Sequence, residues 1–64
     1  MSLRPELSSM STALAELSGR LGRLGDELAG TERDDLSTSL YEVERSLTAA
    51  QRRLTKVIDR LDRD

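Results

Sequence analysis

Hydrophobic residues recur along the chain at alternating steps of four and three in two long stretches. The first stretch runs through Leu3, Leu7, Met10, Leu14, Leu17, Leu21, Leu24 and Leu28. The second runs through Leu36, Leu40, Val43, Leu47, Ala50, Leu54, Val57 and Leu61. This spacing is the heptad pattern, which keeps one stripe of an α-helix facing a partner. The chain is therefore expected to form two long helices.

Signals for the end of one helix and the start of another separate the two stretches. Gly30 follows the last leucine of the first stretch, where glycine readily takes the left-handed conformation that ends a helix. Thr31 and Asp34 then have the spacing of a capping box. We predict helices over about residues 4–29 and about 32–62, joined by a turn at about 30–31. So short a link favours an antiparallel hairpin, with Leu28 beside Leu36 and Leu3 beside Leu61.

Small residues form a second stripe directly beside the leucines of the first helix. Its members are Ser8, Ser11, Ala15, Ser18, Gly22, Gly25 and Ala29. A glycine inside a helix costs about 1 kcal/mol relative to alanine. The leucine ladder nevertheless keeps its register through Gly19, Gly22 and Gly25, so we expect a continuous helix. Because small side chains let a neighbouring backbone come close, the stripe is a candidate dimer interface. The residues proposed for it are Ser11, Ala15, Ser18, Gly22 and Gly25.

Length and composition make this a single all-α domain over residues 1–64. The chain has no cysteine, no histidine and one tyrosine, so disulfides and zinc or imidazole chemistry are excluded. A two-helix monomer of 64 residues buries too little apolar surface to offset the entropy of ordering its chain. We therefore expect a homodimer, arranged as a four-helix bundle.

Charge and hydropathy narrow the possible partners and location. The formal net charge of −2 and the lack of interleaved aromatic residues make nucleic acid an improbable partner. No apolar run approaches the roughly 20 residues that span a bilayer, and the N-terminal residues lack the features of a secretion signal. These observations predict a cytoplasmic protein. Nine of the ten basic residues are arginine, which hints at a GC-rich bacterial genome.

The second helix carries the more varied polar surface. Candidate partner-binding residues are Glu42, Glu44, Gln51, Arg53, Lys56 and Arg60. Arg53, Lys56 and Arg60 belong to a basic stripe that could dock an acidic partner or simply remain solvated. We also expect Glu6 to face Arg60 across the hairpin, because antiparallel pairing brings like flanks together.

The spacing of Glu42 and Ser46 resembles that of actinobacterial anti-sigma hairpins that bind cyclic di-GMP. Those hairpins continue with Arg, Gln and Asp at places held here by Ala49, Arg53 and Val57. Two of the five residues match, and a frame beginning at Glu44 matches two as well. The chain is therefore not assigned to that family. The resemblance implies that a hairpin of this size can act as a regulator gated by a small anionic ligand.

Two pairs of carboxylates stand close in the sequence, Asp34 with Asp35 and Glu42 with Glu44. They do not suit acid–base catalysis, because adjacent or alternate helix positions point in different directions. We therefore predict a non-enzymatic protein with no cofactor and no metal. The favoured function is a homo-oligomeric hairpin that serves as a scaffold or adaptor for an unidentified protein partner. The alternative is an anti-sigma-like regulator that sequesters a transcription or signalling factor, gated by a small anionic nucleotide.

Overall fold

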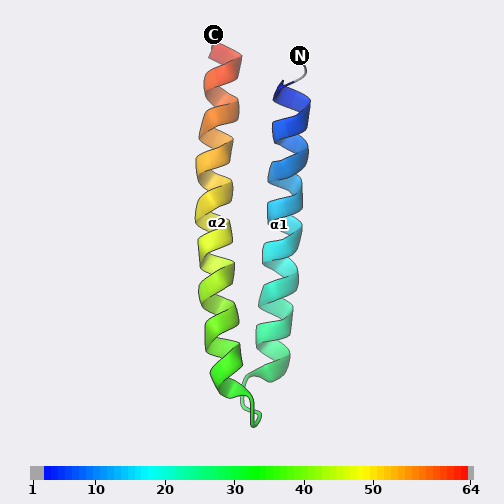
Figure 1. The fold of residues 1–64 in the computed structure, drawn as a ribbon, viewed down its shortest axis with the longest axis vertical. Helices are drawn as coiled ribbons and strands as arrows, with labels where there is room; N and C mark the ends of the chain where they lie inside the picture. Colours follow the sequence, from blue (N-terminus) through cyan, green and yellow to red (C-terminus); the bar gives the residue numbers. More distant parts are fainter. Residues whose placement is uncertain (1–2, 64) are drawn as a thin grey trace.

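The computed structural model describes residues 3–63 of the chain as two α-helices packed against each other (Figure 1). Helix α1 covers Leu3–Leu28 and helix α2 covers Asp34–Arg63. The predicted all-α helical hairpin is confirmed. The start of α1 and the end of α2 lie at one end of the rod, and the connecting loop lies at the other. The hairpin measures 51 × 14 × 12 Å.

Helix α1 continues without a break through Gly19, Gly22 and Gly25, as the leucine ladder predicts. Two of these glycines lie where α2 comes close. A Cβ atom at Gly25 would lie 2.8 Å from Cε1 of Tyr41, and one at Gly22 would meet the carboxylate of Glu44. The helix therefore tolerates the low helix propensity of glycine at positions where a side chain would obstruct the packing of the two helices.

The loop differs from the prediction in where the second helix begins. Gly30 has a φ of 77°, so it ends α1 in the left-handed conformation as expected. The second helix begins at Asp34, two residues later than predicted, because residues 31–34 first make a tight turn. In this turn Asp34 N donates to Thr31 O at 3.1 Å, and Gly30 N donates to the Asp34 carboxylate at 2.7 Å. Arg33 accepts the first helical hydrogen bonds of α2, from Leu36 and Ser37.

The alignment of the two helices along the rod agrees with the predicted register to within two residues. At the open end, Arg4 forms a two-pronged ion pair with Asp62, one residue from the predicted pairing of Leu3 with Leu61. At the loop end, Ser37 Oγ donates to Gly25 O at 2.7 Å. The hydrophobic ladders therefore run side by side along the whole hairpin.

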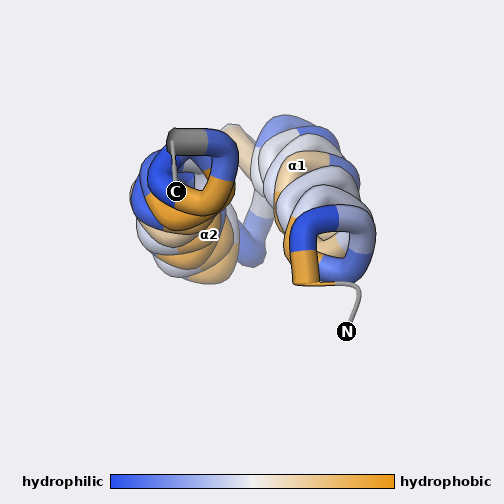
Figure 2. Tube along the Cα trace, turned by 90° about the horizontal axis from the view of Figure 1, so that it is seen from above, coloured by the Kyte–Doolittle hydropathy of each residue, from blue (hydrophilic) through white to orange (hydrophobic). Residues whose placement is uncertain are grey.

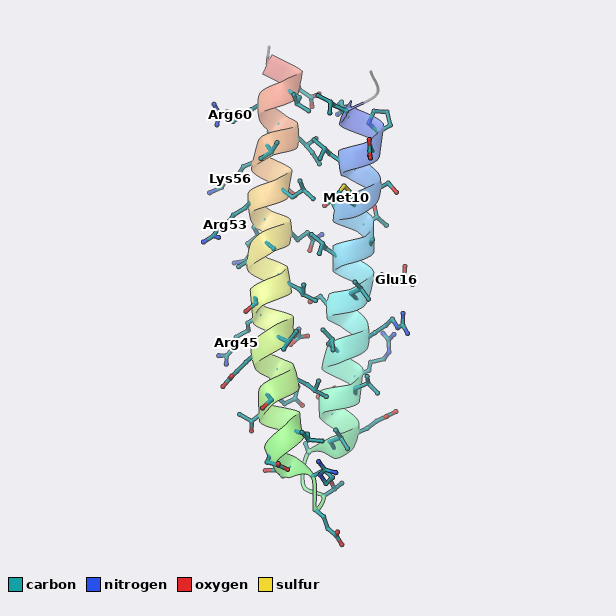
Figure 3. All side chains as sticks on the ribbon, viewed as in Figure 1. Met10, Glu16, Arg45, Arg53, Lys56 and Arg60 are labelled. Atoms are coloured by element: carbon teal, nitrogen blue, oxygen red, sulfur yellow. The ribbon has the colours of Figure 1, made fainter. Side chains whose placement is uncertain are left out.

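The rotation of each helix about its own axis differs from the prediction. The contact uses Leu7, Leu14, Leu21 and Leu28, which are half-buried, together with the small residues beside them. The other four residues of the first ladder turn outward and are exposed: Leu3, Met10, Leu17 and Leu24. Glu6 consequently does not pair with Arg60, whose side chain points away from α1 (Figure 3). That prediction was wrong because the contact is centred on the flank that follows each of these four leucines, not the flank that precedes it.

Candidate interaction surface

Large hydrophobic side chains are exposed along one face of the hairpin, which we call the apolar face. Its members are Leu3, Met10, Leu17 and Leu24 of α1 and Leu36, Val43 and Val57 of α2. Each is between 38% and 52% exposed, and no hydrophobic residue among those described is buried. Seen along the rod, hydrophobic segments of both helices lie toward the same side (Figure 2). The face runs the length of the hairpin. Its members in α1 recur every seven residues, about two turns, and those in α2 lie at residues 36, 43 and 57.

The apolar face exists because small residues occupy the contact between the helices. Ser18 and Ser37 are buried, with exposed fractions of 8% and 3%. The hydroxyl of Ser18 is hydrogen-bonded to that of Thr48 at 3.0 Å, so a buried polar group is satisfied across the contact. Close packing on this side turns the neighbouring row of leucines away from the other helix.

The predicted dimer stripe is therefore largely occupied within the chain. Ser18 and Gly25 are buried, and Ser11 and Gly22 are half-buried; of the five proposed residues, Ala15 alone is exposed. The other four residues lie in the contact with α2 of the same chain. Within the described residues, the large hydrophobic side chains left uncovered are those of the apolar face.

Charged side chains line both outer edges of the apolar face. We call these edges the rims. They consist of charged positions one residue before or three residues after a member of the apolar face or after Ala50, an exposed residue in the same row of α2. The rim of α1 contains Glu6, Glu16, Arg20, Arg23 and Glu27. The rim of α2 contains Asp35, Glu42, Arg53, Lys56 and Arg60. All ten are exposed. Glu16 points away from α2, and Arg53, Lys56 and Arg60 point away from α1 (Figure 3).

The six predicted partner-binding residues fall into two groups. Glu42, Arg53, Lys56 and Arg60 are exposed on the rim of α2. Glu44 and Gln51 are half-buried, and the carboxylate of Glu44 lies against Gly22. The structure therefore does not bring all six together on one surface. The five positions compared with the anti-sigma hairpins do not divide in this way. They are all exposed on α2: Glu42, Ser46, Ala49, Arg53 and Val57.

The opposite flank of the hairpin is held by polar contacts. Arg4 donates to Asp62 with distances of 2.5 and 2.9 Å, and this hydrogen bond lowers the pKa of the Asp62 carboxyl. Tyr41 donates its hydroxyl proton to Asp26, and the hydrogen bond raises the pKa of the tyrosine. These groups already have partners within the chain. The flank they occupy is less suited to a second protein than the uncovered apolar face.

The sequence already contained a signal for the apolar face. Small residues beside one row of leucines favour a close contact on that side, which moves the other row out of the contact. The heptad pattern alone predicts that both rows face the second helix, as in an ordinary coiled coil. The residues of the apolar face that the sequence did not predict are therefore members of the two ladders, which the heptad pattern places in the contact between the helices.

Comparison with known protein families, curated proteins and solved structures finds no match in any of the three. Between residues 3 and 63, neither helix is both long and apolar enough to cross a membrane. The same residues contain no group of three or more acidic side chains placed to hold a metal ion.

Proposed function

We propose that the chain is a non-enzymatic protein–protein interaction module that self-associates through the apolar face and serves as a small scaffold or adaptor. The observation that carries this proposal is the placement of seven large hydrophobic side chains on one face of a hairpin without a buried hydrophobic residue among those described. Contiguous apolar surface rimmed by charge is typical of an interaction site. We expect the protein to act in the cytoplasm.

The size of the exposed surface supports self-association. The hairpin has 5010 Å² of accessible surface, whereas a compact protein of 7.1 kDa is expected to have about 4,100 Å². The excess of about 900 Å² is close to the roughly 800 Å² that each partner contributes to a stable interface. Two copies joined through their apolar faces would form a four-helix bundle with a shared hydrophobic core.

The outward basic residues of α2 offer a second contact, toward a different protein. Arg53, Lys56 and Arg60 are exposed and project from one side of α2 within about two turns. Positive charge in this arrangement attracts an acidic segment mainly by speeding its association. In a dimer the stripe would be present twice, which suits an adaptor that joins two partner chains.

The test of self-association compares Leu17→Gln with a control on the opposite flank, Ala15→Gln. Both positions are exposed in the hairpin, so neither change should prevent helix formation. Leu17→Gln removes apolar burial from both copies, about 1.5–3 kcal/mol per dimer, which weakens association roughly 10- to 100-fold. Ala15→Gln should leave association unchanged. Sedimentation equilibrium measures both.

A wild-type protein that stays monomeric at every concentration used would refute the proposal. So would weakened association in Ala15→Gln with none in Leu17→Gln, because that result assigns the contact to the small-residue stripe. Circular dichroism of each variant checks that helical content is retained.

A further inference from the structure

We propose that the outer side of α2, opposite α1, binds the same side of a second copy in an antiparallel arrangement, through paired opposite charges. We call this surface the polar seam. The contact uses a surface other than the apolar face, so it goes beyond the self-association proposed above. It would join hairpins, or dimers of hairpins, in a manner that depends on salt.

The polar seam is a row of exposed residues that recur along α2 at alternating steps of four and three. Its members are Asp35, Ser39, Glu42, Ser46, Ala49, Arg53, Lys56 and Arg60, and its charged members are the rim of α2. This spacing keeps a row on one stripe of a helix, so that two helices can meet along their length. The side chains of Arg53, Lys56 and Arg60 point away from α1, which locates the stripe on the outer side (Figure 3).

Charge divides the polar seam into two halves. The half near the loop is acidic and contains Asp35 and Glu42. The half near the open end is basic and contains Arg53, Lys56 and Arg60. Among the described residues, no ion pair joins either half to α1. These charges therefore remain available to another chain.

The polar seam is complementary to itself when a second copy lies antiparallel to it. A two-fold axis at the middle of the row places Glu42 opposite Arg53 of the second copy, because the two residues are equally far from the axis. The same axis places Asp35 opposite Arg60 of the second copy. Both pairs occur twice. Each acidic position of the row therefore meets a basic one, which favours the contact.

The same axis also suits the packing of the two helices. It passes between Ser46 and Ala49, whose small side chains let two backbones come close. It lies close to the midpoint of α2, so the two copies of this helix overlap along nearly their whole length. The arrangement that matches the charges is thus also the one that gives the longest contact.

Other pairings of the outer surfaces do not match in this way. A parallel contact of two seams places every charge opposite its own copy. The outer side of α1 carries Glu16, Arg20, Arg23 and Glu27 in this order, so a second copy in either direction brings like charges together. Against the seam with both loops together, Glu16 and Glu27 meet no basic residue at their level. With the loops apart and full overlap, Arg20 and Arg23 meet its basic half.

One pair of residues beside the seam opposes the contact. Arg45 and Arg52 are exposed on α2, and their helical spacing places them on the side of the seam away from the apolar face. The antiparallel arrangement brings Arg45 beside Arg52 of the second copy. Exposed ion pairs are also individually weak and screened by salt. We therefore expect a contact that forms at low ionic strength or at the high local concentration within an assembly.

Two compensating charge reversals test the polar seam. Glu42→Arg alone, or Arg53→Glu alone, turns the two attractive pairs between these residues into repulsive ones. The double variant restores both pairs with the charges exchanged. At low salt we expect each single change to weaken association about tenfold and the double variant to associate like the wild type. Sedimentation equilibrium at about 0.01 M and about 1 M salt measures this, because the screening length falls from about 30 to about 3 Å.

A matched control makes the same exchange on the outer side of α1. Its variants are Glu16→Arg, Arg23→Glu and the combination of the two, all at exposed positions outside the seam. They alter the net charge by the same amounts as the corresponding seam variants. Their association at low salt should match that of the wild type, which separates the local pairing from the overall charge.

Arg45→Glu provides a test with the opposite sign. It replaces the repulsion between Arg45 and Arg52 of the second copy by an attraction, so it should strengthen association at low salt. Loss of a basic residue would instead weaken binding of a different acidic protein to this side of α2. Unchanged or weaker association of Arg45→Glu would contradict the antiparallel arrangement.

The outcomes separate the polar seam from the apolar face. Association that persists at high salt belongs to the apolar face and tests the proposed function. Additional mass at low salt, lost in both single seam variants and regained in the double variant, supports the seam whether or not the apolar face associates. No additional mass at low salt, or a loss that the double variant does not repair, overturns it. Circular dichroism checks that each variant still forms the hairpin.

Discussion

Three glycines in α1 have different surroundings, although they are spaced evenly along one helix. At Gly19 a Cβ atom would meet only Arg23 Nη1, at an ordinary contact distance of 3.7 Å. At Gly22 it would press on the Glu44 carboxylate, which is the mobile end of a flexible side chain. At Gly25 it would press on the ring of Tyr41, which is held by its hydrogen bond to Asp26. Alanine at these sites therefore reports on how closely α2 approaches.

We expect the three alanine substitutions to differ in sign. Gly19→Ala should stabilise the protein by about 1 kcal/mol per chain, because alanine has the higher helix propensity. Gly22→Ala should stabilise it by up to about 1 kcal/mol, since Glu44 can turn aside. Gly25→Ala should destabilise it by about 1 kcal/mol net, because displacing the Tyr41 ring costs more than the propensity gains. Urea unfolding measures all three. Equal stabilisation at all three sites would contradict the close packing at Gly25.

Tyr41 should titrate above its ordinary pKa of 10.0, chiefly because its hydroxyl donates a hydrogen bond to Asp26. As the only tyrosine in the chain, it can be followed by the ultraviolet absorbance of tyrosinate. Since the pKa is raised in the folded state, the stabilisation is fully present below pH 10.0 and is lost as pH rises through the folded pKa. Asp26→Asn should lower the pKa toward its ordinary value. A pKa that is the same in both proteins would exclude the hydrogen bond as the cause.

At the scale of the helices, periodicity was enough to predict the fold. The two ladders specified the helices, and Gly30 located the end of the first, because few residues other than glycine tolerate a φ of 77°. The start of α2 was predicted less well. Thr31 accepts a hydrogen bond from Arg33 N at 3.1 Å, so it stabilises the turn and is not the cap of the helix.

Periodicity could not predict how far each helix is rotated toward the other. A heptad ladder defines a stripe, and a shift of the contact to one side of the stripe leaves the spacing unchanged. The choice depends on packing of small residues: buried Ser18 and Ser37 find hydrogen-bond partners in the other helix. That rotation replaced the predicted pair of Glu6 and Arg60 with the observed pair of Arg4 and Asp62, and it turned the apolar face outward.

For the whole molecule, the rotation has an energetic consequence. A single hairpin satisfies its buried hydroxyls but leaves seven large hydrophobic side chains about half exposed to water. Burial of apolar surface is the main favourable term in folding, so a 64-residue chain that forgoes it is poorly stabilised alone. Association through the apolar face would supply the missing burial. Folding and assembly are then expected to be coupled.

Coupled folding and assembly predict that the melting temperature depends on protein concentration. For a dimer that unfolds to two chains, each tenfold rise in concentration adds about 1.4 kcal/mol to stability, which corresponds to roughly 5 °C for a bundle of this size. Circular dichroism over a hundredfold range of concentration measures the shift. Leu17→Gln should melt at a lower temperature than the wild type throughout, whereas Ala15→Gln should follow the wild type. A melting temperature independent of concentration would mean that the hairpin folds alone, with its apolar face uncovered by a second copy.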